Sequence, residues 1–405
     1  MYLMKYLLRK YLFPNEHNKF MKVLMVTGAY YPEVSGAANQ CLQIVNTLRE
    51  KVNFMVLTTT RNPDLPYQDQ VEGINVFRVH INNKSVRNYC LGILKFTTFF
   101  LSRRRDFQIV HLHGFSLKSA FLILLSKIFH KKIIIKMTSV GHDDPISCGK
   151  RGFPINYFFL KADNYVGVSP QFEDLYRKSG LPLNRYKQIS NGVDINLFQP
   201  VTDGRKIKLR VKLGLPEKMK LILCVGHFSR EKCPEILLHS WKQYVADKYP
   251  DSGIIFVGST NPDHYEVDTV IVEKVERLAK LYQNKRVFFI EETHEIEKYY
   301  QASDLFVLPS LREGLPNALL EAMSCELLVI ASRLEGVTDW VIKDGVNGLL
   351  FTASSIEELG RAITRILSDE TFTVALGRNA RKIILERFMV DKVAEDYKNL
   401  YDEMI

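Results

Sequence analysis

A chain of 405 residues is too long for one compact core and fits two domains of roughly 200 residues each. Its six cysteines are scattered, with no C-x-x-C pair and no cluster with histidine at metal-ligand spacing, which argues against a disulfide framework and structural zinc and favours a reducing compartment. The net charge of +10 is uneven: residues 1–200 carry +14 and residues 201–405 carry −4, so the first half is expected to face an anionic partner.

Residues 1–20 (MYLMKYLLRKYLFPNEHNKF) are the first expected element. Their apolar side chains recur at helical spacing between Lys5, Arg9 and Lys10, which predicts a short basic amphipathic helix that ends at Pro14 and can lie on a membrane. The segment lacks the apolar core and cleavage site of a secretory signal. Two alternatives stay open: an extension that packs on its own domain, or untranslated sequence upstream of a start at Met21. No stretch of the sequence reaches the roughly 18–20 apolar residues of a membrane-spanning helix.

Alternating strand and helix patterns fill the following stretch, residues 21–200. Strands are expected at 22–28, 54–57, 74–78, 109–112, 133–137 and 165–168, and helices at 37–49, 92–101 and 117–129. Short apolar strands that alternate with amphipathic helices indicate parallel βαβ units.

A polar segment, NGVDINLFQP (191–200), and a basic linker with a short helix (201–218) lead into a second α/β series. Its strands are expected at 221–225, 254–257, 287–290, 305–308 and 328–331, and residues 371–405 are strongly helical. The predicted class is therefore α/β, with two doubly wound, Rossmann-like domains facing an interdomain cleft. Ligands bind such sheets at the carboxyl ends of their strands.

Two loops after predicted strands carry candidate phosphate ligands. Gly36 opens a helix after the first strand, and a small residue at a helix start lets the backbone approach a phosphate closely. Arg230 and Lys232 follow the strand at 221–225, where a positive pair can neutralise a diphosphate.

The segment SLREGLPNALLEAMSCELLVIAS (310–332) is the most informative of the chain. Pro316 suits a first helical turn, and the free N–H groups of a helix that starts at Gly314–Asn317 suit a phosphate. Glu313 precedes this helix and Glu321 lies within it. Because carboxylates accept hydrogen bonds from sugar and ribose hydroxyls, the segment predicts a pocket for a phosphorylated, hydroxyl-rich ligand.

This segment resembles the E-x7-E segment of the retaining, GT-B-type glycosyltransferases of the large group 1 family, family 4. Three further segments resemble family segments in order and spacing: YVGVSP (165–170), SNGVDINLF (190–198) and EGVTDWVIKDGVNGLLF (335–351). The resemblance covers about residues 22–402. It implies an acceptor-side domain over 21–200, a donor-binding domain over 201–387, and a final helix, 388–405, that crosses back onto the first domain.

The resemblance also implies an activity, namely metal-independent transfer of a sugar from a nucleoside diphosphate, with UDP as the expected nucleotide, to a hydroxyl acceptor. The nucleotide sugar is a substrate, and no cofactor is expected. The implied catalytic residues are Glu313, on the sugar hydroxyls, and Arg230 and Lys232, on the diphosphate. The implied donor-binding residues are Glu321, on the ribose, with Gly36, Gly314, Leu315, Pro316 and Asn317.

The chain departs from the family pattern at two positions. The arginine that usually follows the glycine of the diphosphate loop is His227 here, so Arg230 is the substitute candidate. Many relatives have a histidine after the strand at 133–137, where this chain has Thr138, with His142 four residues later. The acceptor-side candidates are His113, Lys136, Thr138, Ser139 and His142.

The basic first half fits an anionic membrane surface and a lipid-linked acceptor. These features predict a cytoplasmic protein, peripheral at the inner face of the membrane, that acts in polysaccharide or glycolipid synthesis. Nucleic acid is not expected, because no binding motif is recognisable. The alternatives are a GT-B epimerase or phosphorylase and a non-catalytic sugar-nucleotide-binding protein. The sequence leaves open the donor sugar, the base, the acceptor, the linkage and the oligomeric state.

Overall fold

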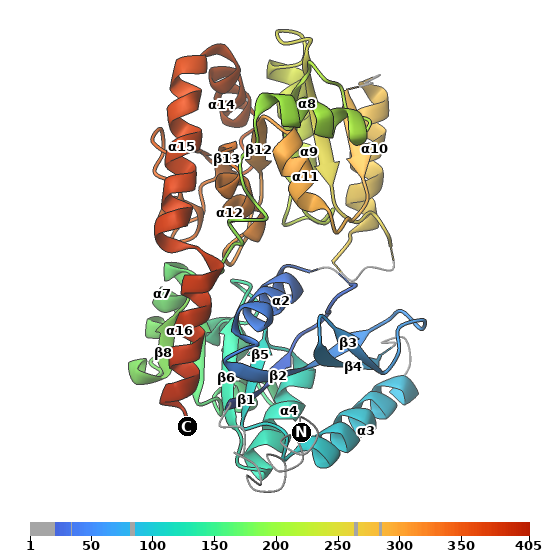
Figure 1. The fold of residues 1–405 in the computed structure, drawn as a ribbon, viewed down its shortest axis with the longest axis vertical. Helices are drawn as coiled ribbons and strands as arrows, with labels where there is room; N and C mark the ends of the chain where they lie inside the picture. Colours follow the sequence, from blue (N-terminus) through green and yellow to red (C-terminus); the bar gives the residue numbers. More distant parts are fainter. Residues whose placement is uncertain (1–20, 34, 82–85, 263–265, 283–285) are drawn as a thin grey trace, which may run out of the picture.

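The computed structural model describes residues 21–33, 35–81, 86–262, 266–282 and 286–405, so the helix expected within residues 1–20 lies outside the described residues. The described chain folds into two α/β units, one above the other in Figure 1. Each unit has a largely parallel sheet between layers of helices. The predicted class, with two Rossmann-like domains, is confirmed.

The first unit is built on an eight-stranded sheet in the order β3-β4-β2-β1-β5-β6-β7-β8. Its strands are β1 (Met21–Val26), β2 (Val52–Thr60), β3 (Gln68–Val71), β4 (Ile74–His80), β5 (Ile109–His113), β6 (Lys132–Met137), β7 (Asn164–Gly167) and β8 (Tyr186–Gln188). Apolar runs such as Ile133–Ile135 are buried on both faces, as parallel strands require.

Two sets of helices cover the two faces of this sheet. Helices α3 (Val86–Arg103), α4 (Leu117–Ile128) and α6 (Ile155–Phe159) pack on one face, and α2 (Gly36–Leu48) and α16 (Val390–Glu403) pack on the other. The remaining helices are α5 (Pro145–Lys150), α7 (Pro170–Lys178) and a 3-10 turn at Leu183–Arg185. One face of the sheet is therefore covered by helices from residues 86–159, and the other face is completed by α16, near the carboxyl end of the chain.

The edge strands β3 and β8 are absent from the prediction. Strand β3 reads QDQV and pairs antiparallel with β4 through a two-residue turn, Glu72-Gly73, in which both residues have positive φ (50° and 84°). Its side chains are mostly exposed or half-buried, so no apolar pattern marks it as a strand.

The second unit is built on a six-stranded, all-parallel sheet in the order β11-β10-β9-β12-β13-β14. Its strands are β9 (Lys220–Val225), β10 (Ser252–Val257), β11 (Val287–Ile290), β12 (Leu305–Leu308), β13 (Leu328–Ser332) and β14 (Leu349–Phe351). Its helices are α8 (Asp203–Lys212), α9 (Pro234–Tyr244), α10 (Thr269–Leu281), α11 (Ile296–Ala302), α12 (Asn317–Ser324), α13 (Thr338–Val341), α14 (Ile356–Ser368) and α15 (Glu370–Arg387).

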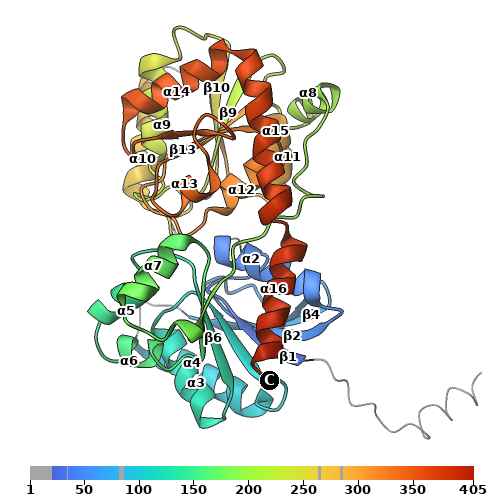
Figure 2. The same ribbon diagram turned by 90° about the vertical axis from the view of Figure 1, so that its left-hand side faces the viewer.

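Two chain segments connect the units, and they are hydrogen-bonded to each other. The N–H of Val193 donates to the carbonyl of Phe388 (2.9 Å), and the N–H of Val390 donates to the carbonyl of Val193 (3.0 Å). Beyond this crossing α16 lies against α2 of the first unit, as Figure 2 shows. Gln40 of α2 holds the connecting segment at Gly192. Its Nε2 donates to the carbonyl of Gly192 (2.8 Å), and its Oε1 accepts from the N–H of Gly192 (3.0 Å).

In the described part of the chain, no helix is long and apolar enough to cross a membrane. The five cysteines that the structure describes in detail are buried and unpaired: Cys41, Cys148, Cys224, Cys233 and Cys325.

Candidate active site

The carboxyl ends of the two sheets face each other, and loops from both units are in contact there. One such contact is at Gly314, where a Cβ atom would lie 2.1 Å from the carbonyl oxygen of Thr138. The two units can therefore meet at this point only because residue 314 has no side chain.

Two helix starts meet across this contact. Ser35 caps α2 by accepting a hydrogen bond from the N–H of Ala38 (3.1 Å), and Asn317, the first residue of α12, donates from Nδ2 to the carbonyl of Gly36 (2.9 Å). Pro316 stands at the N-cap, so the prediction that it lies in the first helical turn is off by one residue. Because each helix start leaves N–H groups without helical partners, the arrangement can hold an anion from two sides.

Asn191 ties the same contact to the connecting segment. Its Nδ2 donates to the carbonyl of Leu315 (2.9 Å) and lies 2.8 Å from Oδ1 of Asn317. The start of α12 is thereby held by the first unit as well as by its own sheet.

Lys232 and Glu313 form an ion pair beside α12, in which the Glu313 side chain is buried and the Lys232 side chain is half-buried. Nζ of Lys232 lies 2.7 and 2.9 Å from the two carboxylate oxygens of Glu313. The Lys232 side chain lies next to Gly226 at the end of β9, since a Cβ atom on Gly226 would be 3.6 Å from Cδ of Lys232. Burial acts to lower the pKa of Lys232, but the Glu313 carboxylate outweighs it and the pKa is raised. The site therefore keeps a permanent cation next to a carboxylate, as a diphosphate and a hydroxyl-rich group require.

Glu321 is a buried residue of α12, and its carboxylate contacts Tyr300 of α11. Its Oε2 accepts a hydrogen bond from the hydroxyl of Tyr300 (2.8 Å). Burial raises the pKa of Glu321 to about 7, although the Tyr300 hydrogen bond opposes this shift. The carboxyl group is therefore poised to change its charge near neutral pH.

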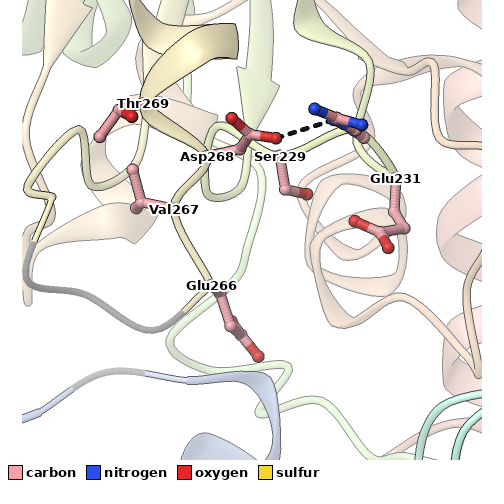
Figure 3. A pocket seen from close by; sticks show the side chains of 7 residues that line it. Ser229, Glu231, Glu266, Val267, Asp268 and Thr269 are labelled. Atoms are coloured by element: carbon pink, nitrogen blue, oxygen red, sulfur yellow. Dashed lines mark hydrogen bonds and ion pairs between the residues drawn. The ribbon is translucent and has the colours of Figure 1, made fainter. Parts of the chain in front are cut away.

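The structure does not bring Arg230 to this cluster. Its side chain is three-quarters exposed, and Nε pairs with Oδ2 of Asp268 (2.9 Å), the residue that caps α10. The pair lies at a surface pocket of about 400 Å³ where three acidic side chains gather, Glu231, Glu266 and Asp268 (Figure 3). Each of these acids has a basic partner: Arg312 pairs with Glu231, His227 lies 3.1 Å from Glu266, and Arg230 pairs with Asp268.

Thr138 and Ser139 form a loop at the end of β6 that is organised by Asp143. One carboxylate oxygen accepts from the N–H and the hydroxyl of Thr138 (2.9 and 2.8 Å), and the other accepts from the N–H of Ser139 (2.8 Å). The side chain of His142 is exposed on this loop, next to Gly141, whose Cβ would lie 3.3 Å from Nη1 of Arg312. The described residues contain no group of three or more His, Cys, Asp or Glu that could hold a metal ion.

His113 and Lys136 belong to a buried polar cluster that we define as His111, His113, Lys136, Tyr397 and Tyr401. It lies between β5, β6 and α16: Nζ of Lys136 is 5.5 Å from the ring centroid of Tyr397, and the hydroxyl of Tyr401 is 2.8 Å from Nδ1 of His111. Burial lowers the pKa of Lys136 to about 7 and holds the pKa of His113 well below its ordinary value. Within the described residues, Nζ of Lys136 has no hydrogen-bond partner. Both side chains face the core under α16.

Four residues at or near the site are absent from the sequence-based candidates. They are Lys118, Asn191, Tyr300 and Arg312. Lys118, in the first turn of α4, donates to the hydroxyl of Thr59 at the end of β2 (2.9 Å). Lys118, Asn191 and Tyr300 have partners remote in sequence, so local patterns carry no signal for them, except for the Asn-Gly turn at Asn191. Arg312 directly precedes Glu313 and pairs with Glu231 (3.1 Å).

Two family models match the chain. The model for glycosyl transferases group 1 matches residues 205–383, and the model for Glycosyltransferase Family 4 matches residues 34–197. The first covers the second unit with Lys232, Glu313 and Glu321, and the second covers most of the first unit.

Similar proteins match nearly the whole chain or about half of it. An uncharacterized glycosyltransferase, MJ1069, of Methanocaldococcus jannaschii is 25% identical over 409 residues, which cover 95% of this chain and 99% of that protein. The UDP-Gal:alpha-D-GlcNAc-diphosphoundecaprenol alpha-1,3-galactosyltransferase of Escherichia coli is 29% identical over 221 residues, 54% of each chain.

Solved structures with the same arrangement include Anabaena Alr3699/HepE in complex with UDP and glucose (TM-score 0.76, 20% identity, 94% of this chain and 99% of that one). The sucrose-phosphate synthase of Thermosynechococcus elongatus has a TM-score of 0.77 at 21% identity and covers 95% and 99% of the two chains. These likenesses confirm the predicted fold of two facing Rossmann-like domains.

Proposed function

This chain belongs to the group 1, family 4 glycosyltransferases, and on that premise we propose that it transfers a sugar from a nucleoside diphosphate to a hydroxyl acceptor with retention at the transferred carbon. The observation that carries the proposal is the ion pair of Lys232 and Glu313 beside the facing starts of α2 and α12. A fixed cation and two helix starts can stabilise a diphosphate leaving group, because their charges and dipoles are in place before the bond breaks.

Each acidic residue has a separate role in this proposal. Glu313 releases part of its contact with Lys232 and accepts hydrogen bonds from the hydroxyls of the transferred sugar. Glu321 accepts hydrogen bonds from the ribose. The acceptor proton goes to the donor phosphate on the same face, so the reaction needs neither a dedicated protein base nor a metal ion. Closure of the two domains over the donor excludes water and limits hydrolysis.

UDP is the nucleotide that we propose for the donor. Alr3699/HepE was solved with UDP and with UDP-glucose, and the Escherichia coli relative is named for UDP-Gal and a diphosphoundecaprenol acceptor. These names, with the basic first half of the chain, support a lipid-linked acceptor in glycolipid or polysaccharide synthesis at the cytoplasmic face of a membrane.

Lys232 and Glu321 are the two side chains whose removal tests the proposed donor site. We expect Lys232→Ala and Glu321→Ala each to cut turnover roughly tenfold or more, because each removes a contact to the donor. The measurement is release of UDP from a panel of UDP-sugars, made with and without added acceptors after a thermal-shift screen has identified a binding donor.

Lys218→Ala is the matched control, since Lys218 is an exposed lysine of the same domain. A circular-dichroism melt of each variant separates lost function from lost fold. Near-normal turnover in a folded Lys232→Ala protein would contradict the proposed site. UDP release that does not depend on an acceptor would favour another reaction class.

A further inference from the structure

Three neighbouring helices of the first unit present apolar side chains to solvent. On α3 the exposed apolar residues are Leu91, Leu94 and Leu101, three and seven positions apart, and on α4 they are Leu117, Leu124 and Ile128, seven and four positions apart. Both spacings place the side chains on one face of a helix. These six side chains are between 40% and 57% exposed.

The same surface continues over α6. Phe153, just before this helix, is 81% exposed, and its ring lies 6.1 Å from that of the exposed Tyr157. Helix α4 packs on α3 and on α6, and the three lie side by side at the lower end of the first unit in Figure 2. We call this surface, formed by the outer faces of α3, α4 and α6, the α3–α4–α6 face.

The α3–α4–α6 face is also strongly basic. Residues 86–162, which contain the three helices, have 13 Lys and Arg but 3 Asp and Glu. Two of these cations do not face the surface, since Lys136 is buried under α16 and Lys118 bonds Thr59, and Lys127 pairs with Asp163 (2.9 Å). Two of the three acidic residues, Asp143 and Asp144, are buried and bind the backbone of their own loop. Exposed cations on or beside the face are Lys95, Arg105, Lys127, Lys132, Lys150, Arg151 and Lys161.

We propose that the α3–α4–α6 face docks on the surface of an anionic lipid bilayer. Leucine and aromatic side chains enter the boundary between headgroups and acyl chains, while long cationic side chains reach the lipid phosphates. Lys161 illustrates the arrangement, since its Nζ lies 4.8 Å from the ring centroid of Tyr157. Apolar and cationic groups therefore share one surface, as an anionic interface requires.

Charge argues against two other occupants of this face. A second copy of the chain would bring two faces of the same sign together. Residues 1–20 carry Lys5, Arg9, Lys10 and Lys19 against Glu16, so they are repelled as well. A nucleic acid would satisfy the charges but would leave the leucine rows in contact with a polar backbone.

The face lies close to the site along α4. Leu117 belongs to the α3–α4–α6 face, and the next residue, Lys118, donates to Thr59 at the carboxyl edge of the sheet. A bilayer on this face would present its headgroups near the acceptor side of the interdomain contact. The inference extends the proposed function by naming a docking surface, but membrane binding can be measured without any sugar transfer.

The test is sedimentation of the full-length protein with vesicles of phosphatidylcholine alone or of phosphatidylcholine with 30% phosphatidylglycerol. We expect partitioning onto the anionic vesicles to be roughly tenfold or more stronger than onto neutral ones. The triple variant Leu94→Gln, Leu124→Gln, Ile128→Gln and the triple variant Lys95→Glu, Arg105→Glu, Lys150→Glu should each lose roughly tenfold or more of this partitioning. Thermal melts check that both remain folded.

The matched control is Val211→Gln, Val270→Gln, Leu281→Gln, three exposed apolar residues of the second unit, and it should bind like the parent. A further arm, Lys5→Gln, Arg9→Gln, Lys10→Gln, tests the N-terminal segment. The proposal is overturned if both face variants bind as well as the parent, if binding is lost only in the N-terminal variant, or if neutral vesicles bind equally well. It is also overturned if an RNA or DNA duplex, but no vesicle, binds through these residues.

Discussion

Glu321 gives the site a titratable group whose pKa is set by its burial in the folded protein. Burial raises its pKa from an ordinary value of 4.5 to about 7, so the folded protein holds this proton more tightly than the unfolded chain. The resulting contribution to the free energy of unfolding is fully present below about pH 4.5 and is lost as the pH rises through 7.

The substitution Glu321→Gln tests this contribution, since it keeps an acceptor for Tyr300 and removes the charge. We expect the variant to be more stable than the parent at pH 8 by roughly 1–3 kcal/mol and to differ little near pH 4.5. Calorimetric melts of both proteins across this range measure the difference. Parallel pH profiles would contradict the shift.

Donor binding should respond to the same titration. A protonated carboxyl is a weaker acceptor for ribose hydroxyls, so the affinity of the parent for UDP should fall as the pH falls below 7. Titration calorimetry at pH 6 and pH 8 gives both affinities. The Glu321→Gln variant should show a smaller dependence.

At the scale of elements, α16 covers a lysine that has no acceptor among the described residues. The ordinary pKa of Lys136 is 10.5, and burial lowers it to about 7. The folded state therefore releases this proton earlier than the unfolded chain. Its cost to stability is greatest below pH 7 and disappears as the pH rises to about 10.5.

We therefore expect Lys136→Met to raise the free energy of unfolding at pH 7 by roughly 1–3 kcal/mol. Lys132→Met, an exposed position on the same strand, is the control and should change little. Urea melts at pH 7 measure both. If Lys136 instead binds the acceptor, the Met variant raises the acceptor KM; an unchanged KM with higher stability assigns Lys136 to packing under α16.

Strands and helices were predictable from sequence to different degrees. The central strands were found because parallel strands, buried on both faces, need apolar runs such as Ile133–Ile135. Edge strands such as β3 are polar on their open side, and a turn with positive φ at Glu72 and Gly73 positions them. Helical spacing alone did not mark the break between α15 and α16 at Phe388, but the family resemblance did, because it implied a final helix that starts at residue 388.

The site was predictable where chemistry is local to a loop. The expected neighbours Glu313 and Gly314–Asn317 lie in one segment, and Lys232 reaches them from the next strand end. Arg230 was assigned from its position in the loop, but its partner Asp268 is 38 residues away and no local pattern reveals it. The orientation of His113 and Lys136 was equally hidden, because it depends on α16 at the far end of the chain.

For the whole molecule, the contact of Gly314 with Thr138 limits how closely the two domains approach. A Cβ atom at residue 314 would lie 2.1 Å from a backbone oxygen, which cannot move without the strand end that carries it. We expect Gly314→Ala to hold the domains apart and to lower kcat/KM roughly tenfold or more, because small misplacements of reacting groups are costly.

Gly204→Ala is the control, because no atom beyond its chain neighbours and its own helix backbone lies within 4 Å of the Cβ position on this glycine. Small-angle scattering with and without UDP measures compaction, and steady-state kinetics measure turnover. The parent should become more compact with UDP, and Gly314→Ala should not. Equal compaction and equal kinetics would mean that this contact does not form during the reaction.

The return of α16 to the first unit has a consequence for how the protein is made. Residues 390–403 leave the ribosome after the entire second unit, yet Val393, Tyr397 and Tyr401 complete the core on one face of the first sheet. Domains usually fold in the order of their synthesis. Here one face of the N-terminal domain stays uncovered until α16 is synthesised, although the C-terminal domain can already fold. We therefore expect the nascent chain to need chaperone protection on the α2 side of its first sheet.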